Sequence, residues 1–522
     1  MSRQSFRTRV RLRLLGALAA TIAVCIPLVS ACGVDSATGS SATRDGTFTF
    51  VVQGPPNSFD PAHLIEGQPA YIWTALFDTL LYLDNEGNLQ PNAAESWEVG
   101  PDRRTLTLKL RPGMTFSSGA PVDATAVRTT MERTKATPGP VQTWLSTVDA
   151  IRTPDDRTVV LELSRPDAAL PYALAMSAGV IGDPATLDDE RTALNPVGSG
   201  PYTLDTTQTV TGSVYVLNRR DDHWNAAAYP FRTVKMRVIA DRTAAVNALQ
   251  AGEADAGSVE VTHLPRMEAA GFDITRVEAT TLVSLSIADR KGESVPALGD
   301  RRVRQAINMA FDRRMITEQL THGMGRPTVQ TFNIAGPGYD PALEGTYAFD
   351  VDGAKRLLAE AGYPNGFTVS MPEVNYLTLF APTITQSLAA IGITVNWEPV
   401  PPQQLVAATA AKRFPLIATV NSTGPFAREL QRFRIDHQNN PFRTSDPRLD
   451  DLIDRYHREA DPARADELAR QINRYTVEAA WDAPLLYTAT QWATKGDVRY
   501  LGTGPQGLPS LRQFGVADRG AP

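Results

Sequence analysis

The chain has 522 residues, of which 42% are hydrophobic and 21% are charged, and its formal net charge is −6. A chain of this length can form two or more domains, each with an ordinary hydrophobic core. No clustered basic stripe offsets the acidic balance, so we expect no nucleic-acid partner.

The first predicted element, residues 1–31, is a secretory signal peptide. Five arginines come first, and the run from Leu14 to Ala31 carries no charge, which is the usual order of a basic and then an apolar region. A membrane-spanning helix is the alternative, but it needs about 20 apolar residues, and this run is shorter and contains Pro27. Because residues 1–31 hold five arginines and no acid, their removal leaves a net charge of −11.

Cys32 closes the motif Val29-Ser30-Ala31-Cys32, which resembles a bacterial lipobox. The resemblance implies that the Cys32 thiol is acylated and becomes the first residue of the processed chain. Cys25 fits less well, because the bulky Val24 precedes it and Pro27 follows it. We therefore expect a lipid anchor on the extracytoplasmic face of the cell membrane, where two or more acyl chains hold a protein stably. A lipidated Cys32 and a removed Cys25 leave no pair of thiols for a disulfide.

Residues 32–46 are small and mostly polar after the cysteine, which is typical of a flexible tether. The folded body is predicted to begin with the β-prone run Thr47–Val52. Farther along, Trp97–Val99 is followed across a turn by alternating leucines over 105–110. This pattern predicts a β-hairpin.

Helix and strand patterns alternate in the rest of the chain. Val234–Val238 alternates apolar and polar residues and predicts a strand, and Asp241 then stands at an N-cap position before a helix over 243–249. Further elements are predicted as helices over 303–311, 351–361, 384–391 and 462–475 and as a strand over 393–397. Asp461 is predicted as the N-cap of the last helix, with Pro462 at its first position. The fold class is therefore α/β, with more than one mixed sheet.

Short motifs built largely from turn and capping residues recur along nearly the whole processed chain. They include Ser58–Pro61, Phe77–Tyr82, Ala94–Trp97, Leu110–Phe116, Ser118–Pro121, Pro196–Tyr202, Ala251–Asp255, Arg301–Ala306 and Leu357–Pro364. Each motif is weak alone, because turn and cap chemistry explains most of them. In this order they resemble the extracytoplasmic solute-binding proteins of ABC importers, in the family that takes up peptides, nickel and opines, known as family 5.

The resemblance implies a two-lobed fold of the periplasmic-binding-protein type, with mixed sheets, a hinge of two crossing strands and an extra subdomain in the first lobe. The implied boundaries are 47–283 plus 487–522 for lobe I, about 80–194 for its subdomain, and 284–486 for lobe II. The crossing strands are expected near Leu282–Leu285 and Pro484–Tyr487, which are apolar and β-prone.

The resemblance also implies a function. The lobes of a monomer would close on an extracellular solute, and an ABC permease with its ATPase subunits would read the closed form, with no catalysis and no cofactor. A secreted lipoprotein hydrolase and a non-transport receptor or chaperone on the same fold stay open as alternatives. For a hydrolase, Gly198-Ser199-Gly200 lacks the Gly-x-Ser-x-Gly spacing, and the sequence has no His-Glu-x-x-His motif or P-loop.

Family members that bind short peptides carry an Arg before the helix that matches Ala381–Ile391, and an Asp in a Gly-Trp-x-x-Asp segment after a later strand. Here the loop expected before that helix, Met371–Tyr376, has no basic residue, and Asn421–Pro425 contains neither Trp nor Asp. A buried charged end of a ligand needs a partner. We therefore expect a longer peptide held by its backbone, or a bulkier polar molecule, rather than a simple dipeptide.

The candidate ligand-binding residues are mostly polar and uncharged. Amide and hydroxyl side chains can donate and accept hydrogen bonds, aromatic rings can wall a cleft or belong to the core, and the single acid can bind a cation or face solvent. These candidates are Phe59, Tyr71, Asn333, Tyr339, Glu373, Asn375, Asn421, Ser422 and Thr423.

A metal site is the remaining option, since nickel carriers share the fold. The six histidines are scattered, with no paired spacing of the kind that binds zinc or nickel. We therefore expect no direct metal site, while a metal chelate bound as a whole complex stays open.

Overall fold

The computed structural model describes residues 44–517, except 375, 376, 378, 402, 403, 436, 438 and 505–508. All of them belong to one compact unit, Ser41–Pro522. The predicted signal peptide, the lipobox with Cys32 and most of the tether lie outside the described residues. In the described part of the chain, no helix has both the length and the apolar character needed to cross a bilayer.

Within the described residues, the largest sheet has nine strands and joins segments from both ends of the chain. Its order is β16 (Leu416–Ser422), β12 (Asp273–Ile287), β17 (Asp482–Thr494), β11 (Ala256–Val259), β1 (Thr47–Val52), β10 (Thr233–Val238), β9 (Val214–Arg219) and β8 (Tyr202–Leu204), with β13 (Arg326–Pro327) on β17. The strands predicted at 47–52 and 234–238 are confirmed. The pairs of β1 are parallel and those of β12 are antiparallel, so the sheet is mixed, as predicted.

A first hydrophobic core gathers around β1. Phe48 and Phe50 are fully buried; Phe48 stacks on Phe231, with ring centroids 4.4 Å apart. The buried residues of this core come from the segments 48–277 and 492–514. A second core draws its buried residues from 283–486, so the chain enters the second core after β12 begins and leaves it along β17.

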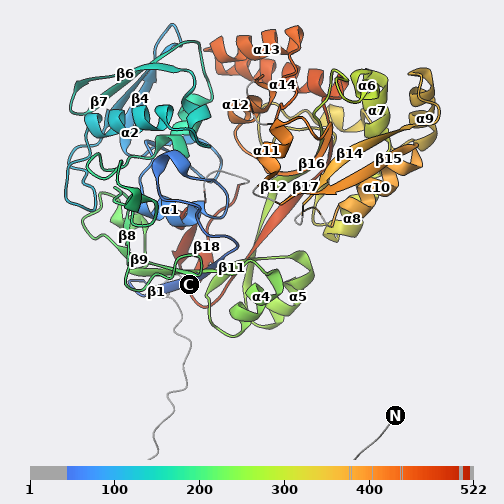
Figure 1. The fold of residues 1–522 in the computed structure, drawn as a ribbon. Coiled ribbons are helices and arrows are strands. Elements are labelled where there is room, and N and C mark those ends of the chain that lie inside the picture. The colour runs from blue at the N-terminus through green and yellow to red at the C-terminus, as the bar shows by residue number, and fades with distance from the viewer. Residues whose placement is uncertain are drawn as a thin grey trace, which may run out of the picture. The chain divides into compact units, whose positions relative to one another are not determined.

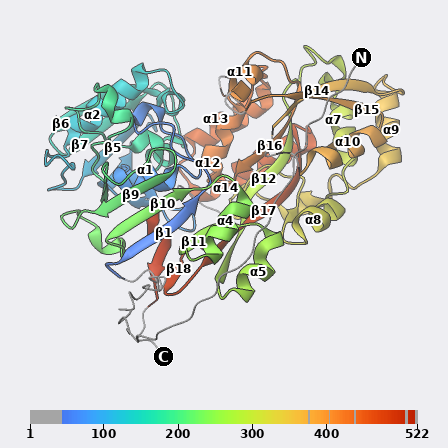
Figure 2. The same cartoon turned by 60° about the horizontal axis from the view of Figure 1, so that its bottom comes forward.

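The long strands β12 and β17 connect the two cores (Figures 1 and 2). They pair antiparallel, with Leu282 opposite Tyr487 and Val283 opposite Leu486, so the segments predicted to cross lie side by side. The pairing is interrupted between Val277 and Thr281. Figure 2 shows β10, β1 and β11 next to one another, with β12 and β17 extending away from them.

A separate four-stranded antiparallel sheet lies within the N-terminal half. Its order is β4 (Ala94–Val99), β5 (Thr105–Leu110), β7 (Thr158–Leu163) and β6 (Val148–Asp155), and α2 (Ala124–Ala136) packs on β6 and β7. Trp97 lies opposite Leu108, which confirms the predicted hairpin. Smaller antiparallel pairs are β2 (Leu81–Leu83) with β3 (Leu89–Pro91) and β18 (Val498–Tyr500) with β19 (Phe514–Val516).

Helices and a parallel strand pair surround the second core. Strand β14 (Phe367–Glu373) pairs parallel with β15 (Ile393–Pro399), and α10 (Ala381–Ala390) forms the crossover between them. The other helices of residues 283–486 are α6 (Pro296–Gly299), α7 (Arg301–Met309), α8 (Arg313–Thr321), α9 (Val351–Glu360), α11 (Leu405–Ala410), α12 (Phe426–Glu429), α13 (Pro447–Arg458) and α14 (Pro462–Glu478). The helices predicted from apolar stripes are thus confirmed.

Two predicted N-caps are confirmed by their hydrogen bonds. The Asp241 carboxylate accepts the backbone N–H of Ala244 at the start of α4 (Arg242–Gln250), and Asp461 accepts that of Arg464 at the start of α14. The remaining α-helices are α1 (Ala70–Leu76), α3 (Leu170–Leu174) and α5 (Leu264–Ala269).

Element boundaries differ from the prediction at three places. The residues Met371–Glu373 continue strand β14 and are not part of the loop before α10. Strand β16 extends through Asn421 and Ser422, which were predicted to follow it. Helix α7 ends at Met309, so Phe311 starts a new segment. Strand pairing explains the first two, since β14 and β16 stay hydrogen-bonded to β15 and β12 beyond their apolar runs.

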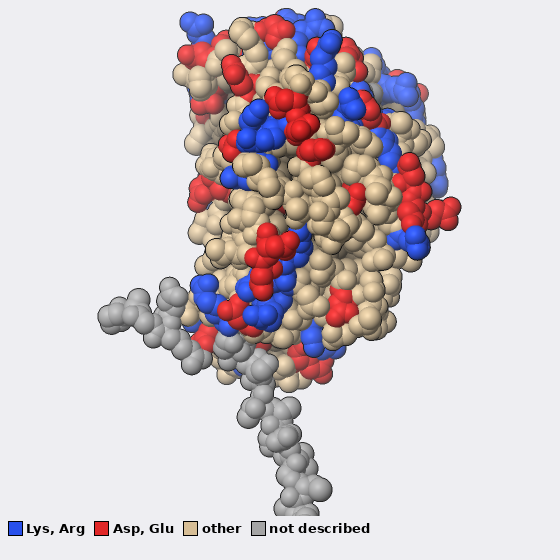
Figure 3. Space-filling model, turned by 90° about the vertical axis from the view of Figure 1, so that its left-hand side faces the viewer, with Lys and Arg blue, Asp and Glu red and all other residues tan. Residues whose placement is uncertain are grey.

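The surface drawn in Figure 3 carries acidic and basic side chains interspersed with uncharged residues. On this face no broad basic area stands apart from neighbouring acids. Charges of mixed sign do not create the extended positive field that attracts a nucleic-acid backbone.

Candidate functional site

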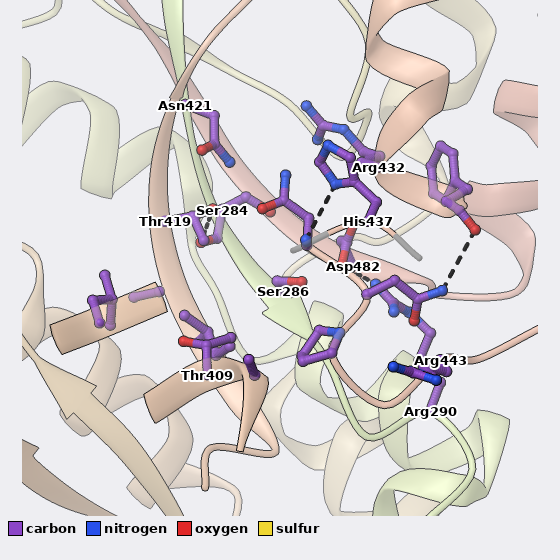
Figure 4. A pocket seen from close by; sticks show the side chains of 18 of the residues that line it. Ser284, Ser286, Arg290, Thr409, Thr419, Asn421, Arg432, His437, Arg443 and Asp482 are labelled. Atoms are coloured by element: carbon purple, nitrogen blue, oxygen red, sulfur yellow. Dashed lines mark hydrogen bonds and ion pairs between the residues drawn. The ribbon is translucent and has the colours of Figure 1, made fainter. Parts of the chain in front are cut away.

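A cavity of about 460 Å³ lies against the junction of β12 and β16 (Figure 4). Such a volume is typical of small-molecule sites. One wall is formed by β12 and β16, a second by α11, and a third by the segment from Arg432 to Arg443. Thr143, from the first half of the chain, borders the same cavity.

The strand wall presents both polar and apolar side chains to the cavity. Side chains alternate between the two faces of a sheet, so Ser284 and Ser286 on β12 share a face, as do Thr419 and Asn421 on β16. Ser284 lies opposite Thr419, and the Thr419 hydroxyl donates to the Ser284 carbonyl oxygen at 3.3 Å. All four residues line the cavity, and they offer hydroxyl and amide groups to a polar solute.

A buried ion pair lies at the end of the cavity near the start of β17. The Arg290 guanidinium donates to Asp482 at 2.7 Å and to the Trp481 carbonyl oxygen at 2.7 Å, and it lies 4.5 Å from the Trp481 ring centroid. The two charged side chains are only 6% and 7% exposed. Burial lowers the pKa of Arg290, while the Asp482 charge opposes this effect and the nearby Arg432 charge adds to it.

A second guanidinium, that of Arg432, borders the cavity without a partner among the described residues. Arg432 stands on the short 3₁₀ turn Leu430–Phe433, and its Nε is buried with no hydrogen-bond acceptor in the described part of the chain. In Figure 4, Arg432 and His437 lie on the opposite side of the cavity from Ser284 and Thr419. His437 Nδ1 accepts a hydrogen bond from the backbone N–H of Asn439 at 3.2 Å.

A second cavity, of about 380 Å³, shares Arg432, His437 and Asn421 with the first. Its lining joins Glu66 and Trp144 from the first half of the chain to residues of the second half. The two cavities therefore form one cleft, which we call the interlobe cleft and define by the lining residues of both. It lies between segments of the two hydrophobic cores.

Direct contacts join the two sides of the interlobe cleft. Arg428 on α12 forms an ion pair with Glu66, and its guanidinium lies 5.3 Å from the Trp144 ring centroid. Arg434 donates to the Ser146 hydroxyl at 3.0 Å. These contacts depend on the two sides being close together.

Glu429 lines the second cavity and is buried. Its two carboxylate oxygens accept the backbone N–H groups of Gly424 and Asn333, each at 3.1 Å. Burial raises the pKa of Glu429 to about 7, although the Arg432 charge and these hydrogen bonds work in the opposite direction. Glu429 thus tethers two loops at the edge of the cleft.

Of the residues predicted to bind ligand, the structure brings Asn421 and Ser422 to the interlobe cleft. Asn421 lines both cavities, and Ser422 lines the second. Both residues lie on the last part of β16, where Asn421 is opposite Leu282 and Ser422 is opposite Thr281 on β12.

Three other candidates lie in packed surroundings. Phe59 is buried and meets Tyr215 edge-on, with ring centroids 6.1 Å apart. Tyr71 is buried in the first core, and its hydroxyl donates to Gln513 at 3.1 Å. The buried Thr423 hydroxyl donates to the Ala279 carbonyl oxygen at 2.6 Å. None of these three belongs to the described lining of the interlobe cleft.

The remaining candidates are spread over other sites. Asn333 is buried and borders a separate cavity of about 160 Å³, and the Tyr339 hydroxyl accepts a hydrogen bond from Arg326 at 2.9 Å. Glu373 is exposed at the last position of β14. Asn375 lies outside the described residues. The roles of all nine candidates stay predictions.

Sequence reasoning missed the charged part of the cleft. Ser284 and Ser286 were detectable, because they alternate with apolar residues in a β-prone run. Arg290, Arg432 and Asp482 gave no such signal, since their positions follow from strand pairing and a short turn. Among the described residues, no group of three or more His, Cys, Asp or Glu side chains has an arrangement that holds a metal ion.

Comparison with protein families gives one match that covers residues 88–433. The matching model is that of the bacterial extracellular solute-binding proteins, family 5, middle region. The match includes the four-stranded sheet, the crossing strand β12 and the turn that carries Arg432.

Curated relatives agree with this match at low identity. A protein of Escherichia coli O1:K1 / APEC named glutathione-binding protein GsiB is 28% identical over 310 residues, which are 57% of this chain and 58% of the relative. A Haemophilus influenzae protein named heme-binding protein A is 25% identical over 398 residues, covering 68% of this chain and 69% of the relative. The chain therefore spans less than two thirds of the length of the glutathione-binding relative.

Solved structures share the fold over nearly the whole chain. The binding protein AgaA of A. tumefaciens R10, in complex with agropinic acid, has a TM-score of 0.78 at 24% identity, covering 91% of this chain and 99% of that one. The periplasmic binding protein DppA of Helicobacter pylori, in complex with the peptide STSA, has a TM-score of 0.79 at 21% identity, covering 91% and 98%. The predicted periplasmic-binding-protein fold is confirmed.

Proposed function

Because this chain belongs to the family 5 bacterial extracellular solute-binding proteins, we propose that it captures a peptide or similar polar solute in the interlobe cleft and delivers it to an ABC import permease. The permease and its ATPase subunits would supply the energy for import. The family is one of binding proteins, and this function requires no chemical change of the solute.

One observation carries the proposal: the interlobe cleft is lined by residues from both sides of the β12–β17 connection. A solute that contacts both sides stabilises the closed arrangement in proportion to its preference for that arrangement. We propose that lobe I (47–283 and 487–522) and lobe II (284–486) move about β12 and β17 when the solute binds. The interruption near Ala279, whose φ is 51°, would be one place where these strands bend.

The polar lining supports a solute rich in amide or hydroxyl groups. Ser284, Thr419 and Asn421 supply hydrogen-bonding groups, while Ile417 and Val420 offer apolar surface in the same cavity. Relatives and structural neighbours carry names or bound ligands that include glutathione, heme, a peptide and agropinic acid. The solute proposed here is a peptide longer than a dipeptide, or a polar molecule of similar bulk.

We also propose that the protein is anchored by lipid at Cys32 on the extracytoplasmic face of the membrane. The support is the sequence order of a basic region, an apolar region and a lipobox-like motif. In the native host, the wild type should sediment with membranes and Cys32→Ala should not be acylated. Retention of a fatty-acylated mass in Cys32→Ala would exclude this anchor.

Native mass spectrometry of the full chain, purified in mild detergent, tests the receptor function. Closure slows solute release, so we expect a discrete mass excess that mild denaturation removes. If the protein is recovered bare, melting curves with peptides, opines, sugars and metal chelates follow, and a solute at about 100 times its Kd adds roughly 2.7 kcal/mol. A bare protein that none of these solutes stabilises would refute the proposal.

A further inference from the structure

We propose that Arg432 binds a carboxylate group of the solute, and that the solutes of this protein are therefore carboxylic acids. This inference rests on the proposed function, because it assigns a ligand-binding residue and a substrate class to the interlobe cleft. It concerns a position outside both segments in which peptide-binding relatives of this fold were expected to carry their charged anchors.

The first support is the place of Arg432. Its side chain lines both cavities at the point where they meet, so a solute that fills either cavity comes next to it. Its Nε is buried and makes no hydrogen bond with the described residues. A buried N–H group that has lost its hydration without gaining an acceptor is unfavourable, and an anionic group of the solute would relieve this cost.

The second support is the pairing of the other charges in the cleft. Asp482 is held by Arg290 at 2.7 Å, and Glu66 is held by Arg428. The third acid, Glu429, directs both oxygens to backbone N–H groups. Among the described residues, each carboxylate that lines the cleft is therefore engaged elsewhere, and Arg432 forms no ion pair within 4.0 Å.

The third support is the match between the guanidinium and its proposed partner. A guanidinium presents parallel N–H groups that a carboxylate accepts in pairs, and such charge-assisted bonds are about twice as strong as neutral ones. A single arginine that forms no pair with the described residues matches the single charge of a carboxylate better than the double charge of a phosphate. Ser284, Thr419 and Asn421 remain available for the uncharged part of the solute.

The test uses a tryptic digest of casein and the same digest after methyl esterification of its carboxyl groups. Each digest is incubated with the full chain in mild detergent, and the retained peptides are measured by native mass spectrometry. The wild type should retain free acids and reject the esters. In Arg432→Gln, retention of acids should fall roughly tenfold to a hundredfold, the usual effect of losing a hydrogen bond between charged groups.

Arg314→Gln is the matched control, since Arg314 is an exposed cation on α8 that lies outside the described lining of the cleft. It should keep the retention of acids within about threefold, a change smaller than one charged hydrogen bond. Arg432→Lys should restore retention only in part, because an ammonium cannot form the paired contact. Without ligand, Arg432→Gln should melt at or above the wild-type temperature, whereas a structural role for Arg432 would lower its melting temperature.

The outcomes separate this inference from the proposed function. If the wild type retains esters as well as acids, or if Arg432→Gln binds acids unchanged, the carboxylate assignment is overturned and the receptor function stands. If inorganic phosphate stabilises the wild type but not Arg432→Gln, and no acid is retained, the site binds phosphate instead. If neither digest is retained, no solute copurifies and no solute of the melting screen stabilises the protein, both proposals fail together.

Discussion

One carboxylate oxygen of Glu429 accepts the backbone N–H of Asn333 at 3.1 Å, across 96 residues of sequence. The pKa of Glu429 is raised to about 7 by burial, above the ordinary value near 4.5. The folded protein therefore binds a proton that the unfolded chain has already lost between about pH 4.5 and 7. Stability contributed by this group is lost as the pH rises through that window.

We predict that the free energy of unfolding falls by up to about 3 kcal/mol between pH 4.5 and 8 because of Glu429 alone. The measurement is urea unfolding of the wild type and Glu429→Gln at several pH values, with the difference between their free energies plotted against pH. Glu98→Gln, at an exposed position on β4, is the control. Its free energy of unfolding should change with pH in the same way as that of the wild type. Parallel curves for Glu429→Gln would contradict the prediction.

The ion pair between Glu66 and Arg428 should favour the closed arrangement. Its side chains are 23% and 20% exposed, so removing it with Glu66→Gln should cost roughly 1 kcal/mol of closure, or about fivefold in solute affinity. Isothermal titration measures the affinity, and small-angle scattering without solute should show a larger radius of gyration. Glu253→Gln breaks a pair with Arg237 that lies outside the described cleft lining, and it should change neither quantity.

The buried pair of Arg290 and Asp482 should show a large asymmetry between single and double substitutions. Asp482→Asn leaves a guanidinium that is 6% exposed without its counter-ion, and we expect a loss of about 3–5 kcal/mol in urea unfolding. Arg290→Met combined with Asp482→Leu should recover much of this loss, because no buried charge remains. Asp273→Asn removes an exposed pair with Arg499 and should cost less than about 1 kcal/mol. A double variant less stable than Asp482→Asn would show that the interpretation is wrong.

The segment Pro196–Tyr202 contains a glycine that the packing requires. A Cβ on Gly200 would lie 2.4 Å from the Leu76 carbonyl carbon and 2.5 Å from the Phe77 backbone nitrogen. Gly200→Ala should therefore destabilise the protein by about 1–3 kcal/mol or more, seen as a lower melting temperature. Gly54→Ala is the control, because a Cβ there meets nothing within 4 Å, and it should be neutral or slightly stabilising. If the two variants melt at the same temperature, the close approach of Leu76 and Phe77 is not the reason why position 200 requires glycine.

Short-range sequence patterns predicted most helices and strands of this protein. Its cleft, in contrast, is formed by contacts between residues far apart in the sequence. The caps at Asp241 and Asp461 depend on residues three positions away, so the sequence pattern is sufficient to find them. The partners Glu66 and Arg428 are 362 residues apart, and no periodicity connects them. Arg432 stands out because none of the described acidic side chains pairs with it. A sequence segment taken alone cannot show this lack of a partner.

The aromatic candidates illustrate a second limit. Phe59 and Tyr71 have the size and polarity that suit a cleft wall, but the same properties suit a core. Only the surrounding rings, such as Phe50 and Trp492 around Tyr71, distinguish the two. These neighbours are contributed by opposite ends of the chain.

Strand β17 lies between β12 and β11 in the central sheet, which has a consequence for the order in which the chain folds. Strands β1 and β11 both lie in the first half of the sequence, yet β11 gains its second neighbour only when residues 482–494 arrive. The sheet is therefore completed by a contact of very high sequence separation, which is a slow step. A chain that ends before residue 482 loses the strand that both cores share, so the last tenth of the polypeptide decides whether the earlier part reaches its final structure.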